Sequence, residues 1–560
     1  MSGENKPLGA ALHLLRVTIE AASPVSLGSG DVIEVSRQRK GERGPEARKE
    51  TTNSTALVRD ANGLPTIPGS TLQGLLHHRY RDEHGDVLAR KLFGYADGTD
   101  GDAGRLVVGF GTVHGQNDQA VAGLIVDAAR ISDDPVLLRL HGHAPLRRDH
   151  VSLNGRHVAD GRKKYDRRAV PVGTRFSIEF SLWGDADETA EDKAVLEDIV
   201  RLFSHPAFRL GGGGRHGYGR ITIRRASYTC PDLGNPIGLR RIRDQIPSLP
   251  FEENLLSDVV TFDDAVTMKL KLTPINPWRI GGEGQYLTEE THGARLANGS
   301  ATAQPGAEPR GKRDRLDVAT ILREPIIMWA NGKAGLRIPG QTSPFDTTLP
   351  NGVAFAVPGS AIKGPLVHRS LFHWNRQRTD IDGMIDVDEW LTWDDDTRKT
   401  ALEERTHRPA RLASLFGAAK ERDDKTGKAG RAYIDDGVVS DVQAAQAVDH
   451  IVIDRFTGGV IPGLLYVEEV LVGGSVDVTI TVSSPARADR TETGDWPREI
   501  RDAFLLALRD LCGGRLAIGA KSLGYCTGDI VAWEGSDPSA SAWKAAWDAL
   551  AALQTRRDAA

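Results

Sequence analysis

The chain has 560 residues, of which 39% are hydrophobic and 26% are charged, and its formal net charge is −5. This length exceeds what one hydrophobic core usually serves, so we expect at least two domains, and the composition excludes a fibrous or disordered protein. No apolar run approaches the roughly 20 residues of a membrane helix, and the N-terminus has no signal-peptide pattern. The three cysteines, Cys230, Cys512 and Cys526, have no spacing typical of zinc sites or disulfide frameworks. These features predict a cytoplasmic protein that has no contact with a membrane.

The charge is distributed unevenly along the chain. Residues 1–240 hold 33 Lys and Arg against 30 Asp and Glu, a balance of +3, whereas the remainder holds 38 against 46, a balance of −8. Basic side chains cluster at 37–49, 162–168 and 310–315. Such clusters are either solvated surface loops or patches that bind a polyanion, and the sequence leaves both interpretations open.

The predicted elements of the first half follow one another in a recognisable order. Alternating apolar and polar residues predict strands at 17–21, 176–182 and 221–223. Ser70 is a favourable N-cap for a helix whose apolar side chains follow at helical spacing, and residues 191–205 have the pattern of a second amphipathic helix. With further strands between these helices, the order is β-α-β-β-α-β. It predicts an α+β fold of the ferredoxin-like or RRM-like type.

The second half repeats the landmarks of the first half in the same order. IPGSTLQGLLHHRY at 67–80 corresponds to VPGSAIKGPLVHRS at 357–370, and LGGGGRHGYGR at 210–220 corresponds to IGAKSLGYC at 518–526. Between them, KLFG precedes GRLVVGFGTV in the first half, and SLFG precedes GRAYIDDGVV in the second. Repetition in matching order predicts two tandem copies of one domain.

We place the first domain at 1–235, a linker at 236–263 and the second domain at 264–560. A loop at about 29–54 precedes the Pro-Gly-Ser helix of the first domain, and an insertion at about 283–346 takes that place in the second. Small polar residues in this insertion predict a mobile or partly disordered segment. A final helix is expected at 540–556.

Two features of each copy are suited to binding phosphate. Six glycines at 211–220 let the backbone approach a ligand, although a flexible hairpin explains them equally well. The start of the Pro-Gly-Ser helix offers N–H groups to an anion. His78 and His368, at the same place in both copies, are either hydrogen-bonded core residues or part of such a site. No Ser-His-Asp, HExxH or paired-carboxylate pattern is evident, and no metal site is predicted.

The landmarks together resemble a known family. A Pro-Gly-Ser helix start, a following Leu-Phe-Gly, an Asp-Arg-x-Thr-Gly turn at 454–458 and a loop ending in Gly-Tyr-Gly are similar to motifs of the RAMP superfamily, the CRISPR-associated backbone proteins of type III effector complexes. The resemblance covers both halves. The first copy departs from it with Gln73 in place of Lys and with Asn154-Gly155 in place of Asp-Arg, and the second copy has the thinner glycine loop.

The resemblance implies an RRM-like core that binds CRISPR guide RNA beside other effector subunits. It also implies a "thumb", the long loop between the first strand and the Pro-Gly-Ser helix, which crosses the guide–target duplex. The residues at positions implied to contact RNA are Ser70, Gln73, His78, Arg79, Gly212, Gly213, Arg215, His216, Tyr218, Ser360, Lys363, His368, Arg369 and Lys521.

In related subunits an Asp on the thumb, six residues before the end of an xPVIxD strand, supports metal-dependent cleavage of target RNA. In the first copy the strand is 55–60 and the position six before Asp60 is Ser54, so Asp31 is only a fallback. In the second copy we expect Asp346 to be catalytic, although a turn-capping role explains it as well. Cleavage of this kind implies Mg²⁺ or another divalent cation beside the scissile phosphate.

These patterns leave three functions open. We expect a fused double backbone subunit that binds guide RNA and cleaves target RNA at the second thumb. One alternative is a guide-processing endoribonuclease that uses His216 with Tyr218, or His150 with Arg148, as acid and base. The other is a structural subunit that binds RNA and partner proteins and has no active site.

Overall fold

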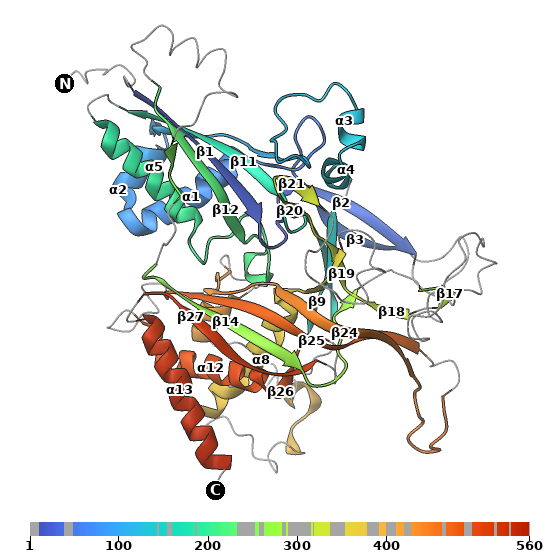
Figure 1. The fold of residues 1–560 in the computed structure, drawn as a ribbon. Coiled ribbons are helices and arrows are strands. Elements are labelled where there is room, and N and C mark those ends of the chain that lie inside the picture. Colours follow the sequence, from blue (N-terminus) through green and yellow to red (C-terminus); the bar gives the residue numbers. More distant parts are fainter. Residues whose placement is uncertain are drawn as a thin grey trace.

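The computed structural model describes residues 11–38, 49–142, 145–153, 159–184, 188–231, 253–256, 262–282, 287–288, 315–316, 318–335, 353–377, 391–398, 410–418, 427–461, 466–485, 495–519, 524–536 and 539–558 (Figure 1). These residues form two main sheets, each with its own hydrophobic core. We call residues 11–256 the first module and residues 262–558 the second module.

The first module is built on an antiparallel sheet of order β13-β12-β1-β11-β8-β4, in which β7 also pairs with β11. Counted along the chain, its four principal strands are β1, β7 with β8, β11 and β12, which gives the spatial order 4-1-3-2. The strands are β1 (Ala11–Ala21), β4 (Thr66–Ile67), β7 (Leu106–Val108), β8 (Gly111–Val113), β11 (Arg175–Gly184), β12 (Ile221–Thr229) and β13 (Glu253–Asn254).

Three helices cover one face of this sheet: α1 (Gly69–His84), α2 (Asp86–Phe93) and α5 (Thr189–Phe203) (Figure 1). Val17 and Ile178 are register partners on β1 and β11 and are fully buried beneath them. In α5, Leu196, Ile199 and Phe203 are buried at the i, i+3, i+7 spacing that the sequence shows. The helix therefore presents one apolar face to the sheet.

The second module repeats this layout. Its sheet has the order β19-β22-β24-β25-β14-β27-β26, with β18 and β23 also paired to β25 and β15 paired to β18. The strands are β14 (Ala265–Pro274), β15 (Gly281–Gly282), β18 (Val318–Ile321), β19 (Arg323–Pro325), β22 (Val353–Val357), β23 (Ala432–Ile434), β24 (Gly437–His450), β25 (Tyr466–Ser483), β26 (Gly513–Ala517) and β27 (Tyr525–Glu534). The helices are α8 (Gly359–Gln377), α11 (Ala410–Phe416), α12 (Arg498–Cys512) and α13 (Ser539–Asp558).

The α+β, ferredoxin-like fold predicted from the sequence is confirmed. In the second module β27-β14-β25-β24 again gives the order 4-1-3-2, and even the irregularities recur. The pairing of β1 with β12 shifts register after Thr18, and that of β14 with β27 shifts after Lys269. Division into tandem domains at 1–235 and 264–560 stays a prediction, because most of the predicted linker lies outside the described residues.

Several hairpins and short helices project from the sheets. The predicted first thumb forms an antiparallel pair of β2 (Gly28–Gln38) and β3 (Lys49–Leu57). The others are β5 (Gly94–Asp97) with β6 (Asp100–Ala103), β9 (Leu146–Leu153) with β10 (Ala159–Ala169), β16 (Leu287–Thr288) with β17 (Arg315–Leu316), β20 (Met328–Ala330) with β21 (Lys333–Gly335), and the helices α3 (Ala129–Ser132), α4 (Pro135–His141) and η2 (Gly214–His216).

Part of the predicted second thumb insertion is not a mobile segment. Residues 318–335 form β18 to β21, and Ile327 belongs to the hydrophobic core of the first module. Ile327 reaches a partner surface at Val172, 155 residues away in the sequence, while the mobility predicted from the polar run at 293–316 stays a prediction, because nearly all of that run lies outside the described residues. Among the described helices, none combines the length and the hydropathy needed to cross a membrane.

Candidate nucleic-acid interface

Packing requires a glycine inside each Pro-Gly-Ser motif, at Gly69 and at Gly359. A Cβ built on Gly69, where α1 begins, would overlap the backbone oxygen of Val108, and one built on Gly359, where α8 begins, would overlap that of Ile434. Both helix starts therefore lie directly against the second strand of their sheet. This close approach explains why the string recurs at the same place in both modules.

The second repeated glycine has no such explanation inside the protein. Apart from the adjoining residues and the nearby backbone of the same helix, no described atom lies within 4 Å of a Cβ built on Gly74 in α1 or on Gly364 in α8. Glycine in a helix interior is unfavourable by about 0.5–1 kcal/mol relative to alanine. Both helices therefore keep a bare stretch of backbone, which is a place where a ligand can approach closely.

The two helix starts differ in what they already bind. The expectation that Ser70 caps α1 is wrong, since the N-cap is Pro68, no side chain caps the first turn, and Ser70 is an exposed helical residue. Ser360 has the same place in α8, but there the N–H of Gly359 donates to Asp436 Oδ1 at 2.8 Å. A carboxylate of the protein therefore occupies the start of α8.

Two of the polar side chains predicted on α1 bind within the protein. Gln73 Nε2 donates to the Phe93 oxygen at 3.1 Å, and Arg79 Nη2 donates to the Ala207 oxygen at 3.0 Å. His78 lies on the exposed side of the helix. Of these three, His78 is the side chain left facing solvent.

On α8 the predicted residues lie partly inside the second module. Arg369 and His373 both donate to Asp510 Oδ2 on α12. Burial alone would raise the pKa of Asp510, but these two hydrogen bonds hold it below its usual value. Lys363 is 8% exposed and His368 is half-buried.

The glycine-rich loop takes its shape from positive φ angles at Gly211, Gly213, Gly217 and Gly219. Tyr218 inside it is fully buried, and its hydroxyl bonds to His150 Nε2 at 2.8 Å. Burial, and then the nearby Arg148 and Arg167, lower the pKa of His150 to about 4. The Tyr218 ring predicted to stack on RNA is thus enclosed by protein.

This loop connects the two modules through ion pairs and hydrogen bonds. Arg209 donates to Asp435 Oδ1 at 2.6 Å, and both side chains are nearly fully buried. Arg215 Nε donates to the Gly430 oxygen at 2.6 Å, and Arg220 pairs with Asp435 Oδ2 at 3.2 Å. The glycine-rich loop is therefore an element of the contact between modules.

A second buried ion cluster lies beside it. Arg148 on β9 binds both oxygens of Glu324 on β19 and, at 2.5 Å, Asp436 Oδ2. Arg148 is 3% exposed. We call the contact made by Arg148, Arg209, Arg215, Arg220, Glu324, Asp435 and Asp436 the joint.

The β20–β21 hairpin and the residue before it add hydrogen bonds and a cation–π contact to the joint. The N–H of Ile327 donates to the Val172 oxygen at 2.9 Å, and Trp329 Nε1 donates to the Gly173 oxygen at 2.7 Å. The guanidinium of Arg175 lies 4.1 Å from the centre of the Trp329 ring. The second module thus contacts the first through this hairpin as well as through ion pairs.

Basic groups collect at the margin of the joint. His216 is half-buried, and burial followed by the charge of Lys363 lowers its pKa to about 3. Arg167 and Arg215 also face it. Within the described part of the chain Arg167 has no carboxylate partner, and its hydrogen bond goes to Ser26 Oγ at 3.5 Å. Positive charge from both modules therefore meets here.

The Asp-Arg-x-Thr-Gly turn is a preformed projection that residue-level prediction missed, although its motif was visible in the sequence. Asp454 Oδ1 accepts from the N–H groups of Phe456 and Thr457 at 2.8 Å each, and these bonds lower the pKa of Asp454. Phe456 is 98% exposed and Arg455 is exposed beside it. An aromatic ring and a cation thus extend together from the second module.

Of the two predicted catalytic residues, the structure describes Asp31 and not Asp346. Asp346 and Lys521 lie outside the described residues. Asp31 is exposed on β2, where Ser29 Oγ donates to its carboxylate at 3.1 Å. Whether any of the three takes part in binding or cleavage stays a prediction.

Backbone hydrogen bonds show that the strand of the second module corresponding to residues 55–60 differs from the one that the sequence alignment indicates. The N–H of Val58 donates to the Leu27 oxygen at 2.9 Å, and the N–H of Leu322 donates to the Ile280 oxygen at 2.8 Å. Residues 319–324 therefore match 55–60, and Glu324 takes the place of Asp60. The strand after Asp346, β22, matches β4 instead, so the alignment that favoured Asp346 was wrong.

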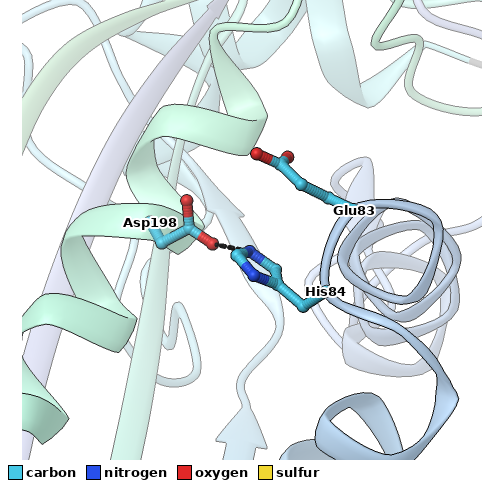
Figure 2. Close-up of side chains that lie close together, drawn as sticks. All are labelled: Glu83, His84 and Asp198. Atoms are coloured by element: carbon cyan, nitrogen blue, oxygen red, sulfur yellow. Dashed lines mark hydrogen bonds and ion pairs between the residues drawn. The ribbon is translucent and has the colours of Figure 1, made fainter.

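Figure 2 shows Glu83 and His84 at the end of α1 facing Asp198 on α5, the one group of possible metal ligands within the described residues. His84 Nε2 bonds to Asp198 Oδ2 at 2.6 Å. Arg201 binds Asp198 at 2.6 Å and also pairs with Glu83. Because Arg201 already neutralises these carboxylates, the cluster is an ion-pair link between two helices.

A Ser-His-Asp arrangement, which the sequence does not reveal, lies on the first sheet. Ser177 Oγ and Asp118 Oδ1 each lie 2.8 Å from a ring nitrogen of His114. Ser177 is 9% exposed in the middle of β11, and its hydroxyl also bonds to Thr18 Oγ1 at 3.1 Å. The hydroxyl is thus held between strands, and the network braces the sheet.

Two sheets of order 4-1-3-2 with basic groups between them define an RRM-like class of protein, whose members commonly bind RNA. Residues 18–222 match the family model described as the RAMP superfamily, so the first module is a domain of that superfamily. In general terms it is therefore a CRISPR-associated RNA-binding protein that acts with other subunits. Comparison with curated proteins finds no match.

Proposed function

We propose that this chain is a fused double backbone subunit of a type III CRISPR interference complex, which holds guide RNA across both of its modules. The observation that carries the proposal is the basic margin of the joint, where the charges of Arg167 and Arg215 lie with Lys363 of the second module around the half-buried His216. A continuous RNA strand bound there would contact both modules at once.

The repeated features support the same path. Gly74 and Gly364 leave bare helix backbone in equivalent places, and the start of α1 has no side-chain cap. Contacts to phosphate and sugar need not depend on base sequence, which suits a protein whose specificity comes from guide–target pairing. Arg455 and Phe456 offer a cation and a stacking surface at the far end of the second module.

The alternative of guide processing is less well supported. Its candidate groups are His216 with Tyr218, or His150 with Arg148; Tyr218, His150 and Arg148 are at most 9% exposed, and His216 is half-buried. An acid and base must reach the proton that they transfer. RNA would reach the three buried groups only if the surrounding structure rearranged.

In addition to guide-RNA binding, the proposal includes cleavage of target RNA at a thumb. Mg²⁺ usually binds proteins through one or two carboxylates and completes its coordination with water and substrate phosphates, so a single thumb Asp suits it. With 319–324 matched to 55–60, the position six before Glu324 is Val318, and the nearest carboxylate in the sequence is Asp317. Asp317 therefore joins Asp346 and Asp31 as a candidate.

RNA binding is tested by measuring guide-RNA affinity against salt concentration for the wild type and Arg167→Gln. Loss of one phosphate contact should weaken binding and reduce the salt slope by about 0.7–1. Arg130→Gln, which removes an exposed charge on α3, is the matched control and should bind as the wild type does. Equal affinity of both variants would contradict the proposed path.

Cleavage is tested in the assembled complex with target RNA, with and without Mg²⁺. We expect cleavage that needs the cation and is lost in one of Asp317→Ala, Asp346→Ala and Asp31→Ala. If all three variants cleave normally, the proposed catalytic role of the thumbs is wrong, while the RNA-binding role stands on the affinity measurements.

A further inference from the structure

The basic margin of the joint contains two kinds of group. Arg167, Arg215 and Lys363 supply positive charge, whereas His216 among them does not. Burial, and then the charge of Lys363 followed by those of other neighbours, lowers the pKa of His216 to about 3, so its ring is neutral at physiological pH. A neutral imidazole between three cations needs a role other than that of a fourth cation.

The backbone on both sides of His216 is held in place. A Cβ built on Gly217 would overlap Asp436 Oδ1 and would lie 2.8 Å from the nitrogen of Gly359, so this backbone lies directly against the start of α8. On the other side, the N–H of His216 donates to the Gly213 oxygen at 2.8 Å. The side chain therefore projects from a fixed turn at the contact between the two modules.

The surroundings of this turn are mainly cationic. The groups that act on the charge of His216 are Lys363 on α8, His150 on β9, Arg167 on β10 and Arg215 on η2. The carboxylate of Asp436 also lies next to the turn, but it already accepts from Arg148 Nη2 at 2.5 Å and from the N–H of Gly359 at 2.8 Å. The margin therefore attracts an anionic backbone without charging the imidazole.

The ring nitrogens of His216 are unused by the protein. Among the residues that the structure describes, none forms a hydrogen bond with them, and neither nitrogen is enclosed. The two arginines beside it do have partners, since Arg215 Nε donates to the Gly430 oxygen at 2.6 Å and Arg167 Nη1 donates to Ser26 Oγ at 3.5 Å. His216 thus keeps one donor and one acceptor for a ligand.

A guide RNA that follows the margin offers three kinds of group to His216. Phosphate oxygens only accept hydrogen bonds, and the neighbouring cations bind them better than a neutral ring does. Base edges are engaged in pairing with the target, and contacts to them would depend on sequence. The 2′-hydroxyl both donates and accepts and is present at every nucleotide. It therefore matches the hydrogen-bonding capacity of a neutral imidazole.

We propose that His216 binds a 2′-hydroxyl of the guide and so selects RNA over DNA, while the cations around it bind the neighbouring phosphates. The inference rests on the proposed path of guide RNA along the basic margin. Affinity would then come from charges that a DNA backbone satisfies as well. Selectivity for the ribose would come from one uncharged side chain that those same charges keep neutral.

The test compares guide RNA with the same sequence carrying 2′-fluoro sugars, which keep the sugar pucker of RNA but cannot donate a hydrogen bond. Affinities are measured by fluorescence anisotropy, and the wild type should prefer the hydroxyl form. His216→Leu should reduce this preference by about 2- to 10-fold, the effect of one neutral hydrogen bond, through weaker binding of RNA alone. His216→Gln, which keeps a donor and an acceptor, should retain the preference.

The matched control is His141→Leu, at an exposed histidine that ends α4 and takes no part in the joint. It should have the preference of the wild type, and circular dichroism shows whether each variant folds. The pH profile of the wild type is a second measurement, which requires no folded leucine variant. Guide-RNA affinity should show no proton uptake by His216 between about pH 6 and pH 8. A gain in affinity as pH falls that is absent from His216→Gln would mean that a charged His216 binds phosphate, and it would overturn the inference.

Arg167→Gln separates this inference from the proposed path of the RNA. It should weaken binding of both nucleic acids alike and leave the preference for the hydroxyl form unchanged. If Arg167→Gln binds guide RNA as the wild type does, the path is wrong and the inference fails with it. If Arg167→Gln weakens binding but His216→Leu keeps the full preference, the path stands and the role of His216 is wrong.

Discussion

Replacement of Arg148 by methionine should open the joint without unfolding either module. The guanidinium is 3% exposed and is the shared counter-ion of Glu324 and Asp436, which are themselves 6% and 14% exposed at their side chains. Methionine keeps much of the volume and removes the charge, so that two carboxylates remain close together with little water. Removal of one partner from a buried ion pair typically destabilises by about 3–5 kcal/mol.

The assay is native-state hydrogen exchange, which reports local opening free energies. The amides of Ile327 and Ala334, which donate across the joint to Val172 and Gln116, should lose about 3–5 kcal/mol of protection. Amides in the middle of β1 should keep theirs. The matched control is Arg16→Met, since Arg16 pairs with Glu179 on the exposed face of the sheet and such pairs contribute up to about 1 kcal/mol.

A further variant tests the electrostatic explanation itself. Combining Arg148→Met with Glu324→Gln and Asp436→Asn removes the uncompensated charges and should restore much of the lost protection. If Arg148→Met changes protection no more than Arg16→Met does, or if the triple variant is less protected than the single one, the joint is not held by this ion cluster.

Three further predictions use other parts of the structure. Burial holds the pKa of His150 near 4 in the folded protein, against 6.5 in the unfolded chain. Because the unfolded chain takes up a proton first, the free energy of unfolding is greatest above pH 6.5 and falls by up to about 3 kcal/mol towards pH 4. Denaturant titrations of His150→Gln at different pH values should lack this loss. Gly69→Ala should destabilise by about 1–3 kcal/mol because its Cβ meets the backbone oxygen of Val108, whereas Gly74→Ala in the same helix, with open space around it, should stabilise by about 0.5–1 kcal/mol; equal thermal shifts would contradict this. Phe456→Ala should leave the melting temperature unchanged and weaken guide-RNA binding by about 1–3 kcal/mol in fluorescence anisotropy titrations. An unchanged affinity would contradict a stacking role for this ring.

The sequence was sufficient for the fold because the signals of fold are local. Alternation along β11 and helical spacing in α5 depend on neighbouring residues, and both patterns appear in the structure where the sequence places them. The order of landmarks in the two halves likewise indicated one layout used twice. Both sheets have the order 4-1-3-2 that this pattern predicts.

The candidate site was predicted less completely because its contacts are not local. Tyr218 and Arg215 looked like surface groups of a flexible glycine loop, but the loop meets residues more than 200 positions away, at Gly430 and Asp435. Nothing in the residues near Tyr218 indicates that its ring packs with Leu146 and Ala169 and that its hydroxyl bonds to His150. The same limit explains Asp346, which was aligned by its distance from the Pro-Gly-Ser string rather than by strand pairing.

The sequence by itself therefore determined the elements, their order and the existence of two similar halves, since periodicity and repetition are written along the chain. Tertiary structure alone decided which repeated residues face outward and which hold the modules together. The physical reason is that burial and ion pairing depend on what lies opposite in space. The aspartates after β23 make a joint only because the arginines of the first module reach them, whereas Gly109 and Phe110, at the same place in the same fold, bring no carboxylate to that position.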